Sequence, residues 1–258
     1  MVQGKDKLMG LKKIKCIFVH GWGMNHAVWQ PVVEQLPDWV EPVCIDLPGH
    51  GKNHDMDFVS LDDLVEFCVA CTDEPAYWVG WSLGGMVVTK LALEHPDKVK
   101  AMMLVANSPC FIQSHDWPHG MATEIFDAFA ENLQTDFPGT IQRFLSLQVQ
   151  GSESGRQILR QIRKQVLAIS SVNIEALHSG LKLLKTVDLR ERVRDLKSPV
   201  TWVLGNKDAL VKASLGKELQ QQLPAADILM FDKASHAPFL SHRDQFNREL
   251  IMAIEKSC

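Results

Sequence analysis

A chain of 258 residues that is 46% hydrophobic is long enough to bury a large core, either as one domain with an insertion or as two domains. Its formal net charge of -4 argues against a nucleic-acid-binding protein and provides no basic surface for a membrane. The lysine-rich N-terminal segment is followed by only a short apolar run, CIFV, and no run approaches the length of a membrane span. We therefore expect a cytoplasmic protein with no nucleic-acid or membrane partner.

The six cysteines are scattered along the chain, and three of them lie within or at the edge of apolar strand-like runs, where a free thiol behaves as a small hydrophobic group. Cys68 and Cys71 have the spacing of a redox or zinc motif. They lie, however, in the helical pattern that includes Leu61, and no second metal-binding pair accompanies them. Buried thiols are expected, with no metal and no organic cofactor.

Six short and almost continuously apolar runs have the composition of strands that are covered on both faces. They span residues 15–21, 40–49, 76–81, 100–109, 199–206 and 226–234. Amphipathic helical patterns lie between most of these runs and after the last one. They span residues 27–36, 60–72, 84–95, 212–222 and 242–256. The alternation predicts an α/β fold with a mostly parallel central sheet flanked by helices.

The alternation is interrupted over residues 111–187, which contain no strand-like run. Four amphipathic helices are predicted there instead, separated at proline, glycine and serine positions. Their approximate ranges are 120–135, 138–149, 153–169 and 172–186. A helical insertion after a core strand would cover the carboxyl edge of the sheet, where such folds bind ligands. We therefore expect a core made of residues 1–110 and 188–258, with residues 111–187 forming a four-helix cap.

The segment GWSLG, residues 80–84, joins a strand-like run to a helical pattern. Glycines two positions before and after Ser82 would let the strand and the helix approach closely and would leave the serine on a strained, reachable turn. This spacing is that of a nucleophile elbow. The alternative is a glycine-rich turn with an incidental serine, because a five-residue motif also matches by chance.

A serine nucleophile needs a histidine that accepts its proton and an acid that orients the histidine. In folds of this type the chain order is serine, acid, histidine. Among the ten histidines, His236 is the loop histidine that directly follows the last strand-like run, and Asp208 directly follows the run before it. Asp188 precedes that run and lies at the wrong edge, while Asp232 is too close to the histidine along the chain. The expected triad is therefore Ser82, Asp208 and His236.

Such chemistry also needs two N–H donors that stabilise the oxyanion formed at the attacked carbonyl. The backbone N–H of Leu83, directly after the serine, is one candidate. The other is the N–H of Trp22 in the segment VHGWG, which ends the first strand-like run. If the serine motif were accidental, this segment would be only a glycine turn with a tryptophan in it.

The segments HGWG, DLPGHG, GWSLGG, GNKD and SHAPF occur in this order, and the chain resembles the α/β-hydrolase superfamily over essentially its whole length. The resemblance implies the α/β-hydrolase fold. A closer similarity is carried by HGWGMNHAVW, WVGWSLGGMV, ANSPCF followed by DWP, RFLSLQVQG, LKTVDLR and HAPFLSH. These segments resemble the family of pimeloyl-acyl carrier protein methyl ester esterases of biotin biosynthesis, and they include parts of the cap, which varies most between hydrolases.

This resemblance implies a serine carboxylesterase that removes the methyl ester from a pimeloyl chain carried on acyl carrier protein, freeing the carboxylate that biotin synthesis needs. It implies the same triad, with no cofactor. Trp81 joins the expected substrate site because it neighbours the nucleophile. The expected substrate-binding residues are Trp22, Trp81, Leu83, Phe144, Leu145, Ser146, Leu147, Gln148 and His236.

Acyl carrier proteins are acidic, so their enzyme needs a basic surface near the mouth of its pocket. Arg156, Arg160, Arg163 and Lys164 share one face of the third predicted cap helix, and Arg143 on the preceding helix could join them. The alternative is an ordinary solvated helix face. The enzyme is expected to act as a monomer.

Two other functions compete with this interpretation. A general short-chain carboxylesterase or a carbon-carbon bond hydrolase would use the same triad. A non-catalytic binding protein with a hydrolase fold would normally have lost one of the three residues, whereas all the expected positions are filled here.

Overall fold

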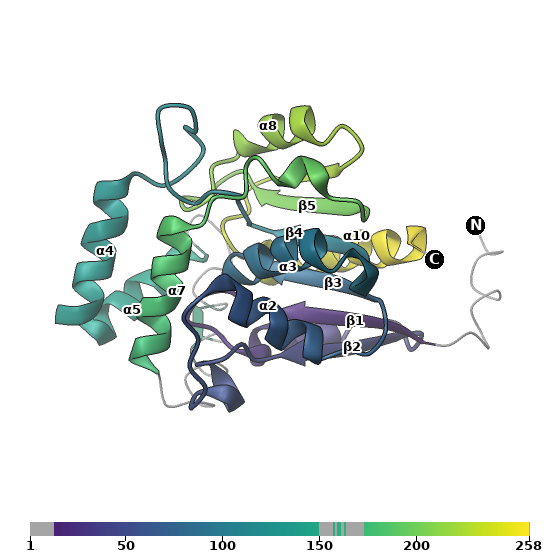
Figure 1. The fold of residues 1–258 in the computed structure, drawn as a ribbon, viewed down its shortest axis with the longest axis horizontal. Coiled ribbons are helices and arrows are strands. Elements are labelled where there is room, and N and C mark those ends of the chain that lie inside the picture. The colour runs from purple at the N-terminus through teal and green to yellow at the C-terminus, as the bar shows by residue number, and fades with distance from the viewer. Residues whose placement is uncertain (1–12, 150–156, 158, 161–162, 164–172, 258) are drawn as a thin grey trace.

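The computed structural model describes residues 13–149, 157, 159–160, 163 and 173–257 (Figure 1). Its centre is a six-stranded sheet in the order β2-β1-β3-β4-β5-β6, with parallel pairing between all neighbours. The strands are β1 (Ile14–Val19), β2 (Val40–Ile45), β3 (Ala76–Trp81), β4 (Val99–Val105), β5 (Val200–Gly205) and β6 (Asp227–Phe231). The predicted parallel sheet is confirmed.

Helices cover both faces of the sheet, which explains why its strands are apolar almost throughout. One face packs against α2 (Leu61–Ala70), α3 (Leu83–Glu94) and α8 (Leu215–Gln222), and the other against α1 (Gln30–Val33), α9 (Pro238–Ser241) and α10 (Arg243–Lys256). In Figure 1, α2 and α3 lie in front of the strands and α10 lies behind them. Along β3, Trp78 joins the first apolar cluster while Tyr77 and Val79 join the second, as alternating side chains require.

Some elements are shorter than predicted, for identifiable reasons. The pattern over residues 27–36 forms a 3-10 turn followed by the single turn of α1, which has Pro31 in its first turn. Strand β2 stops at Ile45 because the next residue, Asp46, uses its carboxylate to bind the backbone of the following loop. Strand β4 stops at Val105 because Ala106 has a φ of 45°, which no strand accommodates.

Between β4 and β5 the chain leaves the sheet and forms the helical insertion, α4 (Thr123–Thr135), α5 (Phe137–Leu147) and α7 (Ile174–Thr186). In Figure 1 these three helices lie together at the left of the sheet, and α4 contacts both of the others. The helix expected over residues 153–169 lies largely outside the described residues, although Arg160 and Arg163 within it are helical. None of the described helices is long and apolar enough to cross a membrane.

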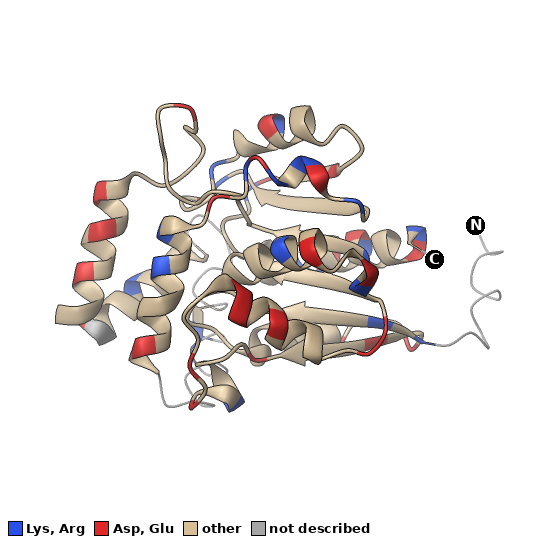
Figure 2. Ribbon diagram, in the orientation of Figure 1, with Lys and Arg blue, Asp and Glu red and all other residues tan. Residues whose placement is uncertain are grey.

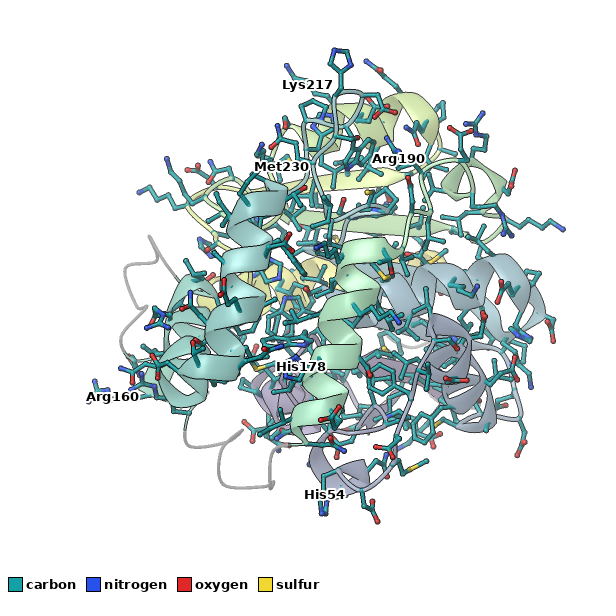
Figure 3. All side chains as sticks on the ribbon, turned by 60° about the vertical axis from the view of Figure 1, so that its left-hand side comes forward. His54, Arg160, His178, Arg190, Lys217 and Met230 are labelled. Carbon is teal, nitrogen blue, oxygen red and sulfur yellow. The ribbon has the colours of Figure 1, made fainter. Side chains whose placement is uncertain are left out.

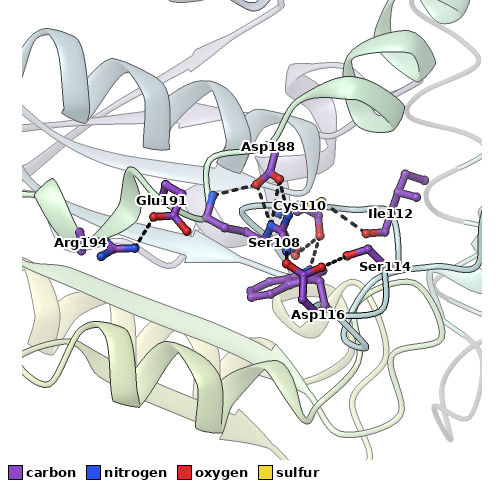
Figure 4. Close-up of polar contacts among 10 residues, drawn as sticks. Ser108, Cys110, Ile112, Ser114, Asp116, Asp188, Glu191 and Arg194 are labelled. Carbon is purple, nitrogen blue, oxygen red and sulfur yellow. Dashed lines mark hydrogen bonds and ion pairs between the residues drawn. The ribbon is translucent and has the colours of Figure 1, made fainter.

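Arg190 ties together the two chain segments that lead into and out of the helical insertion (Figure 4). Its Nε and Nη2 donate to the Asp188 carboxylate at 2.9 and 2.7 Å, and its Nη1 donates to Asp116 at 3.0 Å. The guanidinium also lies over the ring of Trp117, 5.5 Å from the centroid. Its hydrogen bonds lower the pKa of the Asp188 carboxyl. The segments DWP and LKTVDLR thus meet in one contact, which we call the Arg190 clasp.

Arg190→Ala is expected to lower the free energy of unfolding by about 1–3 kcal/mol, because two carboxylates lose a charge-assisted partner. The arginine side chain is 23% exposed, whereas those of Asp188 and Asp116 are 43% and 71% exposed, so solvent partly screens these contacts and the loss should fall in the lower half of that range. Urea unfolding measures the change. Arg194→Ala is the control, since its pairing with Glu191 involves side chains that are 59% and 87% exposed and should contribute under about 1 kcal/mol. Equal losses in the two variants would contradict the role of the clasp.

Candidate active site

The expected catalytic residues come from loops at one edge of the sheet, the edge formed by the carboxyl ends of the parallel strands. Trp22 follows β1, Ser82 follows β3, Asp208 follows β5 and His236 follows β6. The chain runs from β1 to β2 on one side and later returns to β3 on the other side of β1. In open parallel sheets, ligands bind at such a point.

Ser82 has a strained backbone, with φ 54° and ψ −117°. A residue other than glycine in such a region typically costs about 1–3 kcal/mol and is held there by its surroundings. Here the Ser82 N–H donates to the Val105 carbonyl of the neighbouring strand at 2.9 Å, and α3 begins at the next residue, Leu83. The serine side chain is therefore placed on a tight turn between β3 and α3, as the elbow motif requires.

The glycines of the motif are required by close approach of the backbone. A Cβ on Gly80 would collide with the Gly84 carbonyl, and a Cβ on Gly84 would collide with the carbonyl oxygens of Val19 and His20. Both positions therefore exclude a side chain for steric reasons. The same packing brings β1, β3 and the start of α3 into contact around the serine.

His236 and Asp208 form a buried pair. Nδ1 of His236 lies 2.8 Å from Oδ2 of Asp208, and the two side chains are 1% and 0% exposed. The other carboxylate oxygen accepts the backbone N–H groups of Leu210 at 2.8 Å and Val211 at 3.1 Å, which fixes its orientation. A carboxylate partner requires that Nδ1 carry the proton. Nε2 is thus left as a proton acceptor, and it has no hydrogen-bond partner among the described residues.

The loop that carries His236 is fastened on both sides of the histidine. Trp81 Nε1 donates to the His236 carbonyl at 2.8 Å. Ser235 Oγ donates to the Leu147 carbonyl at 3.1 Å, and the Ala237 N–H donates to the Gln148 carbonyl at 3.2 Å. The end of α5 and the neighbour of the nucleophile therefore both hold the histidine loop.

The two expected oxyanion donors border the serine. Leu83 is the first residue of α3, so its N–H has no acceptor within the helix. The loop of Trp22 approaches so closely that a Cβ on Gly21 would be 3.3 Å from the Cβ of Ser82. The Trp22 indole is fixed from the other side, where its Nε1 donates to the Leu177 carbonyl at 2.8 Å.

Three aromatic rings gather beside this edge. Trp22 packs edge-on against Phe144 of α5, with ring centroids 4.9 Å apart, and against Phe129 of α4, at 5.6 Å. Phe129 and Phe144 are 5.8 Å apart. Sequence reasoning missed Phe129, because its position in an amphipathic helix is indistinguishable from an ordinary core position. Sequence reasoning also missed Gly180 of α7. This glycine lies against Trp22, because a Cβ at its position would collide with the Trp22 indole.

A family model described as alpha/beta hydrolase fold matches residues 17–243. The chain belongs to this α/β-hydrolase family. Solved structures that resemble it include an esterase (EaEST) from Exiguobacterium antarcticum, with a TM-score of 0.85 and 18% identity over 95% of this chain and 93% of that one. A bromoperoxidase from Bacillus anthracis has a TM-score of 0.84 and 17% identity, covering 94% and 92%. The enol-lactonase from Burkholderia xenovorans LB400 has a TM-score of 0.82 and 20% identity, covering 94% and 92%.

A second set of polar contacts in this α/β hydrolase supports the loop after β1. His20 is fully buried, with Nδ1 donating to the Gly21 carbonyl at 2.8 Å and Nε2 accepting the Leu47 N–H at 3.1 Å. Burial, followed by the neighbouring His50, lowers the pKa of His20 to about 3. The imidazole is therefore neutral at physiological pH and can serve as both donor and acceptor in this loop.

Asp46, directly after β2, holds the adjacent loop of the hydrolase. Burial acts to raise the pKa of this carboxyl, but the N–H groups of Lys52 and His26 donate to it and hold the pKa below its usual range. The carboxylate is therefore ionised, and its oxygens bind His26 and the Lys52 N–H, whereas the carboxylate that contacts His236 is that of Asp208.

The remaining expected substrate residues lie on and after α5 of the hydrolase. Leu145 and Gln148 are buried, whereas Phe144 and Leu147 are half-buried. Ser146 is exposed and its hydroxyl donates to the Gln142 carbonyl of its own helix, so the structure does not bring this side chain to the triad. Its selection rested only on its place within the matching segment.

The expected docking residues are only partly described. Arg143 is exposed and is held by its own helix, with Nη2 at 2.9 Å from Thr140 Oγ1 and 3.3 Å from Asp136. Arg160 is exposed and Arg163 is half-buried, while Arg156 lies outside the described residues. Of the three described arginines, Arg143 and Arg160 are thus exposed to solvent.

The chemistry that these groups support is acyl transfer. In the part of the hydrolase that the structure describes, no cluster of three histidine, cysteine, aspartate or glutamate side chains could hold a metal ion. At this edge of the sheet lie a strained serine and a histidine that a carboxylate orients, and Nε2 of that histidine makes no hydrogen bond to the Ser82 hydroxyl in this structure. Family membership and this geometry together support a hydrolase.

Proposed function

We propose that this α/β hydrolase is a serine carboxylesterase that removes the methyl ester from a pimeloyl chain carried on acyl carrier protein, in biotin biosynthesis. The chemistry is carried by the buried pair of Asp208 and His236, whose Nε2 is available as a base at the edge that carries strained Ser82. The substrate is supported by the segments WVGWSLGGMV, RFLSLQVQG and LKTVDLR, which resemble that esterase family.

The proposed reaction has two steps. Nε2 of His236 takes the proton of the Ser82 hydroxyl as its oxygen attacks the ester carbonyl carbon, while the N–H groups of Trp22 and Leu83 stabilise the oxyanion. His236 then protonates the departing methoxide, which leaves as methanol, and an acyl-serine remains. Water that gives a proton to the same histidine then attacks the acyl-serine, and His236 passes that proton to the Ser82 oxygen as the acyl bond breaks and the free carboxylic acid is released.

The aromatic rings beside the serine suit the apolar part of such a substrate. Trp22, Phe129 and Phe144 offer ring faces and edges against which the methylene groups of a pimeloyl chain would pack. The same rings would shield the methylene groups of the acyl chain from water. They come from the core and from two helices of the insertion, so the acyl site depends on the insertion staying docked.

The charged residues of the helical insertion favour docking of an acidic carrier protein on one of its surfaces over another. The exposed face of α4 carries Glu124, Asp127 and Glu131, which appear as red bands in Figure 2 and would repel it. Arg160 lies beyond α5 in a separate helical segment and is exposed. We therefore place the proposed docking surface on the arginine side, away from the outer face of α4.

Mass spectrometry of the enzyme incubated with the methyl ester of pimeloyl-acyl carrier protein tests the proposal. The carrier-bound substrate is expected to lose the mass of one methylene group as the ester becomes an acid. The double variant Arg156→Glu, Arg160→Glu is expected to raise KM for this substrate by about tenfold or more, since two attractions become repulsions. Its rate on a free short-chain methyl ester should match that of the parent.

Lys217→Glu is the matched control for charge reversal. Lys217 is exposed on α8, and in Figure 3 it lies far from Arg160 across the molecule. The Lys217→Glu variant should have the same KM for the carrier-bound ester as the parent. Hydrolysis of the free ester alone would instead favour a general carboxylesterase with the same triad. A parent protein inert toward both esters and toward a fluorophosphonate probe would favour a non-catalytic binding protein.

A further inference from the structure

Asn107, two residues beyond the end of β4, makes a side-chain contact with the nucleophile's own backbone. Its Nδ2 donates to the Ser82 carbonyl at 3.2 Å, and the residue is fully buried. We propose that Asn107 is a positioning residue that holds Ser82 in the strained conformation from which it attacks the ester. This inference rests on the proposed function, in which Ser82 is the nucleophile.

A bend in the backbone at Ala106 directs the next residue, Asn107, toward Ser82. Ala106 has a φ of 45°, a left-handed conformation that is rare for residues other than glycine. Its N–H donates to the Val203 carbonyl at 2.8 Å, and Trp202 Nε1 donates to the Asn107 carbonyl at 2.9 Å. Both anchors belong to β5, so the backbone of Asn107 is fixed independently of the contact with Ser82.

The carboxamide of Asn107 has one allowed orientation. A Cβ on Gly85 would be 2.6 Å from the Asn107 Cβ, so the second glycine after the serine makes room for this side chain. The Ser82 carbonyl is an acceptor only, which requires that the amide nitrogen face it. The amide oxygen is buried and has no hydrogen-bond partner among the described residues. Among the described residues, the carboxamide of Asn107 is therefore held by its hydrogen bond to the Ser82 carbonyl.

Two left-handed residues, Ser82 and Ala106, therefore end neighbouring strands and are linked in both directions. The Ser82 N–H donates to the Val105 carbonyl at 2.9 Å, and the Ser82 carbonyl receives Asn107 Nδ2. The Met86 N–H of α3 also donates to that carbonyl, at 3.1 Å. The peptide groups on both sides of Ser82 are thus held by hydrogen bonds, which oppose any change in the backbone φ and ψ that set the direction of the serine side chain.

The variant Asn107→Asp tests this role, because its carboxyl has the same shape and changes donor character with pH. When protonated, it can donate to the Ser82 carbonyl as the amide does. When ionised, it can only accept, and it faces a carbonyl oxygen at hydrogen-bonding distance. Burial raises the pKa of an unpaired carboxyl, so the change should fall within the range in which the enzyme can be assayed.

Rates on p-nitrophenyl butyrate are measured against pH for the parent and for Asn107→Asp. The parent is expected to reach a plateau at high pH. The variant is expected to give a bell-shaped profile, with kcat at high pH reduced about 10- to 100-fold and KM unchanged, since Asn107 is not expected to touch substrate. Asn107→Ala should show a reduced kcat at every pH.

Asn247→Asp is the matched control. Asn247 is also a buried asparagine whose Nδ2 donates to a backbone carbonyl, that of Val32 at 3.4 Å, and also to Gln35 Oε1 at 2.6 Å, and whose amide oxygen has no partner in the described structure. It lies on α10, in contact with α1, away from the triad. It should lose stability at high pH but keep the parent's profile for kcat, because an effect on stability alone does not reshape the rate of the folded enzyme.

The outcomes separate this inference from the proposed function. A folded Asn107→Asp variant with the parent's plateau, or an Asn107→Ala variant with the parent's kcat, would overturn the positioning role. The thermal midpoint of each variant is measured at every pH, and Asn107→Ala decides the matter if the aspartate variant does not fold. A parent protein that neither hydrolyses the ester nor reacts with a fluorophosphonate would overturn the proposed function itself.

Discussion

Ser82→Ala is expected to reduce kcat for ester hydrolysis by roughly a millionfold, to the level left by substrate binding and oxyanion stabilisation alone. The variant removes the nucleophilic oxygen and leaves Trp22, Leu83 and His236 in place. Binding of acyl carrier protein should be nearly unchanged, because the proposed docking arginines lie on the insertion and not at the serine. Reaction with a fluorophosphonate should disappear.

The measurement pairs a rate assay with a titration of labelled carrier protein. Ser108→Ala is the control, since Ser108 is also buried, follows the adjacent strand β4 and donates its hydroxyl to the Cys110 carbonyl at 2.6 Å. It should keep the parent's kcat. An active Ser82→Ala variant would remove the serine mechanism, whereas an inactive variant that also lost carrier binding would mean that the elbow shapes the docking surface.

The sheet could be predicted from sequence because its strands are buried on both faces. A strand such as β3, in which all six residues are buried, has to be apolar almost throughout, and that pattern is readable without any tertiary information. The ends of strands are set by contacts that the pattern does not contain. Ala106 ends β4 through a left-handed φ that alanine rarely adopts, so nothing in the local composition predicts it.

The same distinction applies to the site. Ser82, Asp208 and His236 could be selected because each follows a predicted strand and the chemistry requires a fixed order. Phe129 and Asn107 could not, because one depends on how α4 docks against Trp22 and the other on a backbone turn between strands. For Ser146 the prediction came only from membership of a matching segment, and the structure shows its hydroxyl donating to the Gln142 carbonyl of its own helix.

Asp208→Asn is expected to lower kcat by about four orders of magnitude while leaving the fold intact. One carboxylate oxygen of Asp208 accepts two backbone N–H groups, and an amide oxygen in its place would keep them. The amide nitrogen would then face Nδ1 of His236. Because that nitrogen is a donor, Nδ1 would have to act as the acceptor and the proton would move to Nε2. The histidine would be correctly placed in the wrong tautomer, unable to take the proton from Ser82.

Asp232→Asn is the control for Asp208→Asn. It tests whether losing any carboxylate near His236 lowers kcat, or only the one that bonds to Nδ1. Asp232 is exposed, and its carboxylate accepts the side-chain N–H of Asn206. Its replacement should leave kcat within about twofold of the parent, since surface substitutions away from such a pair have small effects. NMR of the imidazole N–H in Asp208→Asn should show the proton on Nε2. A variant that kept the proton on Nδ1 and yet lost activity would mean that the charge of Asp208, rather than its control of the tautomer, is what the reaction requires.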